Sequence, residues 1–143
     1  MSKLQFRLNL VPTPQKRAKA RVIGRGKTKH PYVSFWDPSA DDKKIILELL
    51  PSEYRQNLHF HGPVKLQLGY VLKRPKSLGK KSKPHAVRPD VDNLCKLIMD
   101  VFNGVLYEDD KQVTDLRVRK RYARVDEEPG ICVVIEDDPE PWE

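Results

Sequence analysis

The sequence predicts a single α+β domain, with a mixed sheet of four or five strands and two principal helices packed on it. Three observations support this class. Several short segments alternate apolar with polar residues, which is typical of half-buried strands. Two longer segments repeat apolar residues every three or four positions, the spacing of an amphipathic helix. The length of 143 residues suits one domain, so we treat residues 1–143 as one unit, with residues 136–143 as a frayed acidic tail.

Five segments are candidates for the strands. Alternation is most regular over residues 64–72, and it recurs over residues 3–10 and 113–122. Residues 130–135 are almost entirely apolar, which predicts a short buried strand. Residues 32–36 are the fifth candidate, so the expected sheet has four or five strands.

Two segments are expected to form the principal helices. The first begins at Asp37, as its N-cap, and ends at about Leu50, and residues 52–58 follow as a short helical piece. The second covers residues 93–103, with Asp92 as its N-cap or as a residue near the cap, and with an Asn-Gly pair as its stop. Five apolar residues form the core-facing stripe of this second helix: Leu94, Leu97, Ile98, Val101 and Phe102.

The chain is basic, with 27 Lys and Arg against 20 Asp and Glu and a formal net charge of +7. Residues 15–31 contain seven of these cations and residues 54–89 contain nine, with no acid in either range. This distribution favours a polyanionic partner. The loop over 15–31 is interpreted either as a solvated loop or as an arm that grips a phosphate backbone and orders on binding. A second basic loop is expected over 73–88.

The sequence also bears on the compartment. No segment approaches the roughly 20 apolar residues of a membrane span, and the first residues alternate instead of forming the apolar region of a signal peptide. Cys95 and Cys132 fall inside an expected helix and an expected strand. We therefore interpret both as small core residues in a reducing compartment, and we expect the protein to be cytoplasmic.

Residues 88–121 concentrate carboxylates in this basic chain. Asp90 and Asp92 lie two apart at the expected start of a helix, and Lys96 and Asp100 follow at four-residue steps on the same face. Two further aspartates come just after the helix. Since such carboxylates repel one another, a bound divalent cation is the simplest reason for them to gather. Asp100 is expected to hold Lys96 or to lie outside the ligand set.

Hydrolysis of a phosphodiester is one reaction that such a site suits. Mg²⁺ prefers carboxylate oxygens, neutralises phosphate charge and acidifies a bound water. The expected ligands are Asp90, Asp92 and Asp110, with Asp109 as the alternative to Asp110. Lys96, one turn beyond Asp92, is expected to contact the scissile phosphate, to help orient the water, or merely to balance the carboxylates.

A structural interpretation of the same residues stays open. In it Asp92 only caps the helix, Lys96 and Asp100 form an exposed ion pair, and the two later aspartates form a polar turn. His59 and His61 alternate around a phenylalanine, which also allows a two-histidine metal site. Without further ligands, solvated or core-edge histidines are the commoner outcome.

The segment PDVDNLCKLIMDVFNGVLYEDDKQV, residues 89–113, resembles the RusA family of endodeoxyribonucleases, which resolve Holliday junctions in bacteria and their phages. The family pattern is an Asp-x-Asp-Asn-Leu-x-Lys core, an aspartate on the same helix, and then Asp-Asp-x-Gln-Val. Every element is present. The basic loop after Pro12 and Pro14 and the Arg-Pro-Lys-Ser stretch at 74–77 also look like the family, and the resemblance covers most of the chain.

The resemblance implies a homodimeric, Mg²⁺-dependent nuclease, with Mn²⁺ as a possible substitute, that nicks two opposing strands of a four-way junction symmetrically in DNA recombination and repair. The family's catalytic aspartates match Asp90, Asp92 and Asp110, and its essential lysine matches Lys96. A dimer suits the near two-fold symmetry of a junction. It also implies a bacterial or phage-infected cell as the setting.

Basic residues of the loops and of one strand are the candidates for DNA backbone contacts: Lys16, Arg17, Lys19, Arg21, Lys73, Arg74, Lys76, Arg88, Arg117, Arg119 and Arg121. Three other functions remain open. The protein is a less selective nuclease of flaps and forks, a non-catalytic junction-binding protein, or a domain that a metal ion stabilises.

Overall fold

The computed structural model describes residues 3–17, 19–23, 32–56, 58–139 and 141. The elements in chain order are β1 (Lys3–Leu8), β2 (Lys19–Ile23), β3 (Tyr32–Trp36), α1 (Ala40–Leu49), α2 (Ser52–Gln56), β4 (Val64–Leu72), the single-turn η1 (Lys76–Leu78), α3 (Val91–Phe102), the single-turn η2 (Asp110–Gln112), β5 (Val113–Tyr122) and β6 (Gly130–Asp137).

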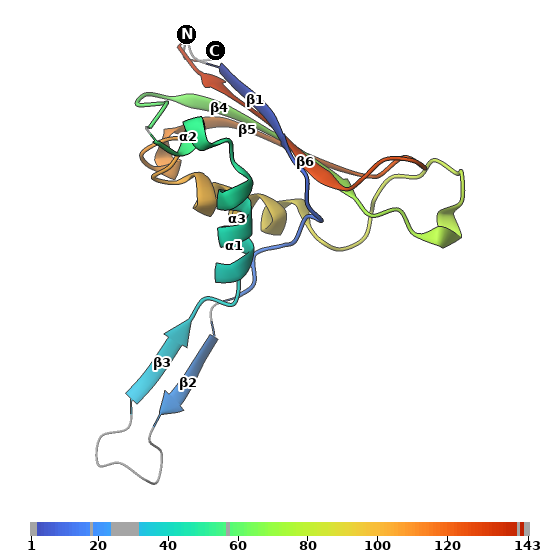
Figure 1. Ribbon diagram of the computed structural model, residues 1–143, viewed down its shortest axis with the longest axis horizontal. Coiled ribbons are helices and arrows are strands. Elements are labelled where there is room, and N and C mark those ends of the chain that lie inside the picture. Colours follow the sequence, from blue (N-terminus) through green and yellow to red (C-terminus); the bar gives the residue numbers. More distant parts are fainter. Residues whose placement is uncertain (1–2, 18, 24–31, 57, 140, 142–143) are drawn as a thin grey trace.

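Four of the strands form a mixed sheet in the order β1-β6-β4-β5. Strands β4 and β5 are parallel, whereas β6 pairs antiparallel with both β4 and β1. A parallel pair needs a crossover connection, and α3 lies within the one that joins β4 to β5. Figure 1 shows all three helices on one face of the sheet and none on the other. The predicted α+β class, with a mixed sheet and two long helices, is confirmed.

The core lies between the helices and the covered face of the sheet. Every second residue of β4 is buried there, including Leu66, Leu68 and Tyr70. The apolar stripe expected on the second principal helix is confirmed, because all five of its residues are buried on α3. The opposite face of the sheet has no such cover, and we call it the open face.

The sequence expectation for residues 15–31 is wrong at residues 19–23, which form β2 instead of a loop. They pair antiparallel with β3, from Lys19 opposite Trp36 to Ile23 opposite Tyr32. The resulting hairpin extends away from the sheet and helices (Figure 1). Residues 24–31, within the same predicted loop, lie outside the described residues.

Both principal helices begin at a different residue from the one expected. The N-cap of α3 is Asp90 and not Asp92, because the carbonyl of Asp90 already accepts the first helical hydrogen bond, from Leu94 N at 3.1 Å. The N-cap of α1 is Ser39. Asp37 lies two residues earlier and accepts a hydrogen bond from the Ser39 N–H at 2.8 Å.

Two expectations near the C-terminus are also corrected. Fraying was expected from residue 136, but β6 continues to Asp137, and Asp138 N donates to Pro63 O at 2.8 Å. Cys132 was expected in the core and is exposed, because it alternates with buried neighbours and so points to the open face. Cys95 is buried, and both thiols are free. In the part of the chain that is described, no helix combines the length and the apolar character that crossing a membrane requires.

Candidate active site

The start of α3 is held in place by two residues that are partners across β4 and β5. Tyr70 and Lys120 are opposite each other in the parallel register. The Tyr70 hydroxyl donates to Leu94 O at 2.9 Å, in the first turn of α3. The Lys120 ammonium donates to Val87 O at 2.5 Å and to Pro89 O at 2.9 Å, just before Asp90. The sheet therefore fixes the backbone on both sides of the Asp90–Asp92 segment.

Asp90, Asp92 and Lys96 all have exposed side chains on α3. Gln15 N adds a backbone hydrogen bond to Asn93 O at 3.0 Å, so the segment before the hairpin also contacts this turn. Within the described part of the chain, Lys96 forms no hydrogen bond and no ion pair. Its ammonium is therefore available one turn beyond Asp92.

The ion pair considered between Lys96 and Asp100 is not formed, because another lysine takes Asp100. Lys43 of α1 lies 3.3 Å from the Asp100 carboxylate and 2.7 Å from that of Asp37. Burial lowers the pKa of Lys43, but the hydrogen bonds to these two carboxylates outweigh it, and the pKa is raised overall. Lys43 thus joins α1 to the last turn of α3.

The turn after α3 separates the roles of its two aspartates. Asp109 is the N-cap of η2, where its side chain accepts from Lys111 N at 2.9 Å. The Gln112 side chain completes this turn by accepting from Asp109 N at 2.9 Å and donating to Gly62 O at 2.9 Å. One oxygen of Asp109 is thus used by the backbone of the turn.

Asp110 contacts a buried phenol. The Tyr107 hydroxyl, at the base of this turn, donates to Asp110 Oδ1 at 2.9 Å. Burial raises the pKa of Asp110, and repulsion from Asp100 and Asp109 acts in the same direction against the Tyr107 hydrogen bond. The pKa of Tyr107 is itself raised, first by burial and then by the same hydrogen bond.

The predicted metal ligands therefore lie in two groups along α3. Asp90 and Asp92 are at its start, whereas Asp110 lies near Asp100 at its end, and ten helical residues span about 15 Å. Within the described residues, no three His, Cys, Asp or Glu side chains are close enough together to hold one metal ion. Carboxylate oxygens are the ligands that Mg²⁺ prefers, so the three aspartates suit the ion chemically. In this single chain, however, Asp110 is too far from Asp90 and Asp92 to share one ion with them.

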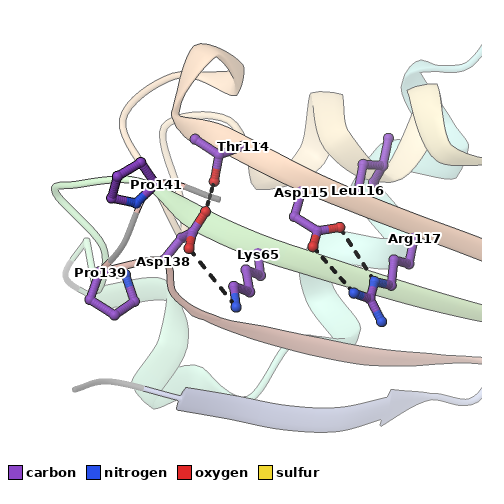
Figure 2. A pocket seen from close by; sticks show the side chains of 8 residues that line it. All are labelled: Lys65, Thr114, Asp115, Leu116, Arg117, Asp138, Pro139 and Pro141. Atoms are coloured by element: carbon purple, nitrogen blue, oxygen red, sulfur yellow. Dashed lines mark hydrogen bonds and ion pairs between the residues drawn. The ribbon is translucent and has the colours of Figure 1, made fainter. Parts of the chain in front are cut away.

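The arginines of β5 lie on the open face, as their alternation predicted. Arg117, Arg119 and Arg121 are opposite Gln67, Gly69 and Val71 of β4, respectively. Arg117 Nε lies 3.4 Å from Asp115, and both residues line a hollow of about 650 Å³ together with Lys65 and Asp138. Figure 2 shows these side chains. The guanidinium of Arg121 forms a bidentate pair with Glu127, in which it donates to the two carboxylate oxygens at 2.6 and 2.8 Å.

The other predicted DNA contacts differ in their surroundings. Arg74 is a structural residue of its loop, because its guanidinium donates to Gly79 O at 2.7 Å, to Ala123 O at 3.1 Å and to Lys81 O. Lys16 lies 3.8 Å from Asp42. Exposed side chains are present at Arg17, Lys19, Lys73, Lys76 and Arg88, and the side chain of Arg21 lies outside the described residues.

Sequence reasoning missed three residues of this site. Nothing in the local sequence pointed to Lys43 or Tyr107. Lys43 contacts Asp100, which is distant in the sequence, and Tyr107 contacts Asp110 because of the turn that follows α3. A signal was present for Lys120. Alternation along β5 places the arginines at 117, 119 and 121 on one side of the strand and Lys120 on the apolar side. A lysine on a core-facing position requires buried acceptors, and here the acceptors are the carbonyls before Asp90.

Fold and site together define a basic α+β protein that presents aspartates at a fixed helix start on one face of the sheet and a row of arginines on the other face, residue types suited to nucleic-acid phosphates and their metal ions. A family model described as endodeoxyribonuclease RusA matches residues 9–136. The chain belongs to the RusA endodeoxyribonuclease family, which implies an endodeoxyribonuclease of Holliday junctions. It is also similar to YqaN of Bacillus subtilis (strain 168), an uncharacterized protein, with 34% identity over 124 residues, covering 79% of this chain and 85% of YqaN.

Proposed function

We propose that this protein is a Mg²⁺-dependent resolvase that acts as a homodimer and places two symmetric nicks in a four-way junction. The observation that supports this most directly is the start of α3. There Asp90 and Asp92 are exposed on a backbone that Tyr70 and Lys120 fix from below. Fixed carboxylates of this kind are what positioning catalysis requires.

In this proposal Asp90 and Asp92 would hold Mg²⁺, for which Mn²⁺ is a substitute, and Asp110 would complete the set only when the two groups, which are separated along α3 in this single chain, come together on binding DNA as a dimer. The ion supplies charge neutralisation and an acidified water. Lys96, which has no described partner, binds a non-bridging oxygen of the scissile phosphate. A water molecule would attack phosphorus in line with the 3′-oxygen and lose a proton to solvent, while the P–O3′ bond breaks and the 3′-oxygen takes a proton from solvent, which yields a 5′-phosphate and a 3′-hydroxyl.

The remaining residues position the substrate. Arg119 has no described hydrogen bond or ion pair and faces solvent on β5, so it is a candidate for a backbone phosphate. A two-fold symmetric dimer presents two such sites to the two opposing strands. Contacts of this kind release counterions, so junction binding is expected to weaken steeply with salt.

The test is cleavage of an end-labelled four-way junction with Mg²⁺ or Mn²⁺, beside a linear duplex, a flap and the Asp90→Asn protein. Paired symmetric nicks in the junction alone, and a loss of at least 100-fold in rate for Asp90→Asn with binding retained, are expected. Equal cutting of flap and junction would instead indicate a general nuclease of branched DNA. Tight binding without cutting under either ion would indicate a non-catalytic protein.

A further inference from the structure

A second cationic feature lies at the end of β5 and includes Arg74 and Arg121, which were described above. The loop after β4 and the connection from β5 to β6 enclose a hollow of about 290 Å³, which we call the basic hollow. Six cations line it: Arg74, Lys80, Lys81, Lys83, Arg121 and Arg124. The sequence has no acid between residues 54 and 89, so the loop contributes positive charge alone.

Internal bonds give this hollow a fixed wall. The guanidinium of Arg74 joins the loop carbonyls of Gly79 and Lys81 to that of Ala123, which follows β5. On the same side, the His85 ring packs on Tyr122 with their centroids 4.5 Å apart. The loop is thereby attached to the end of β5 at two points, and the hollow does not depend on a ligand for its shape.

Glu127, an acid close to this hollow, is already paired with one of its cations. Both carboxylate oxygens of Glu127 accept from Arg121, and Glu127 Oε1 also accepts from Arg124 N at 3.0 Å. The pKa of Glu127 is lowered to about 2 by the Arg121 hydrogen bond first and the Arg124 N–H second. Glu127 is therefore paired with Arg121, and no lysine of the loop forms an ion pair with it among the described residues.

Three lysines of the hollow, Lys80, Lys81 and Lys83, have no counterion among the described residues, whereas the charge of Arg124 is partly balanced by Glu127. The side chains of Lys80, Lys81, Lys83 and Arg124 are exposed and form no hydrogen bond or ion pair with any residue that the structure describes. Several unpaired cations converging on one concave surface repel one another, and an anion in their midst removes that repulsion.

We propose that the basic hollow binds one backbone phosphate of the DNA arm that leads to the cleavage site. The occupant follows from location as well as charge. Tyr122, which lines the hollow, lies two residues beyond Lys120 on the same face of β5, and two strand residues span about 7 Å. Lys120 itself holds the carbonyls before Asp90. The proposal rests on the proposed function, because it takes branched DNA as the substrate.

The experiment measures junction binding in EDTA, so that it does not depend on cleavage. The variant is Lys81→Gln/Lys83→Gln/Arg124→Gln, which leaves Arg74 and Arg121 in place. A matched variant, Lys3→Gln/Lys44→Gln/Arg55→Gln, removes the same charge from exposed positions elsewhere. The hollow variant is expected to lose at least tenfold in affinity near 100 mM salt, and the matched variant less than threefold.

The salt dependence tests how many phosphates are bound. Since each neutralised phosphate contributes about 0.9 to the slope of log affinity against log salt, the hollow variant should lower the slope by about 1 and not by about 3. Junctions with single neutral methylphosphonates should identify one position whose replacement weakens the wild type but not the variant. Equal behaviour of the two triple variants would overturn the proposal.

The same data separate the two hypotheses. If the wild type binds junctions but never cuts them, the proposed function fails while the binding comparison still decides the basic hollow. If it cuts junctions and the hollow variant binds as the matched variant does, only the basic hollow is refuted. If inorganic phosphate at low millimolar concentration abolished the difference in junction affinity between the wild type and the hollow variant, the hollow would be a site for free anions. That result would also overturn the proposal.

Discussion

Substitution of Lys120 by methionine tests whether the strand beneath α3 positions the catalytic aspartates. The ammonium donates to Val87 O and Pro89 O at 2.5 and 2.9 Å, and methionine keeps the length and apolar stem of the side chain while removing both bonds. Val87 is exposed, so its carbonyl regains water, whereas Pro89 is half-buried. We therefore count one charged hydrogen bond as lost.

Loss of such a bond costs about 2 kcal/mol. For a domain of this size, that cost lowers the melting temperature by roughly 6–8 °C. The protein should remain folded at 25 °C, since native domains typically have about 5–15 kcal/mol of stability. The backbone before Asp90 then moves, and because a displacement of about 1 Å can cost 10²-fold in rate, kcat should fall about 10- to 100-fold.

The assay is single-turnover cleavage at 25 °C, with the enzyme in saturating excess over the junction, and thermal unfolding of the same samples. Lys3→Met on β1 is the matched control, and Tyr70→Phe removes the partner bond to Leu94 without a change of charge. Junction affinity in EDTA should stay within threefold of wild type. A Lys120→Met protein that melts earlier yet cleaves within twofold of wild type would refute the positioning role and leave a structural one.

Three further predictions concern single contacts. Tyr107→Phe removes a hydrogen bond that lowers the pKa of Asp110. The pKa of Asp110, followed by NMR, should therefore rise, and the free energy of unfolding should fall by about 1 kcal/mol. An unchanged titration of Asp110 would contradict the contact. Glu127→Gln breaks the pair with Arg121. Because folding lowers the pKa of Glu127 from 4.5 to about 2, its stabilisation is present above about pH 4.5 and disappears towards pH 2; melting temperatures of wild type and variant should therefore differ at pH 7 and converge in acid, and a constant difference would contradict this. Gly130→Ala places a methyl group 2.9 Å from a carbonyl oxygen of β1, which should cost about 1–3 kcal/mol in urea unfolding, whereas a neutral effect would show that β1 can move aside.

Much of the local structure was determined by the sequence alone. The bounds of β4 and β5, the buried stripe of α3 and the class of fold all follow from periodicity, because alternation and helical spacing report directly which side chains face a core. The order of Asp90, Asp92 and Lys96 on α3 is likewise a property of helix geometry.

The pairing of these elements was decided only by the tertiary structure. Residues 19–23 lack a clear apolar pattern, and they form a strand because β3 supplies the backbone partners. Asp100 pairs with Lys43 because α1 packs beside α3, although its sequence spacing pointed to Lys96. Cys132 is exposed because no helix covers that face of the sheet.

The candidate site shows the same division. The sequence supplied the aspartates and Lys96, since they lie within one motif. It did not show that Lys120 supports the backbone before Asp90, that Tyr107 binds Asp110, or that Arg74 shapes the loop around the basic hollow. Each of these contacts depends on a turn or on strand order, and local periodicity carries no information about which distant segments fold against each other.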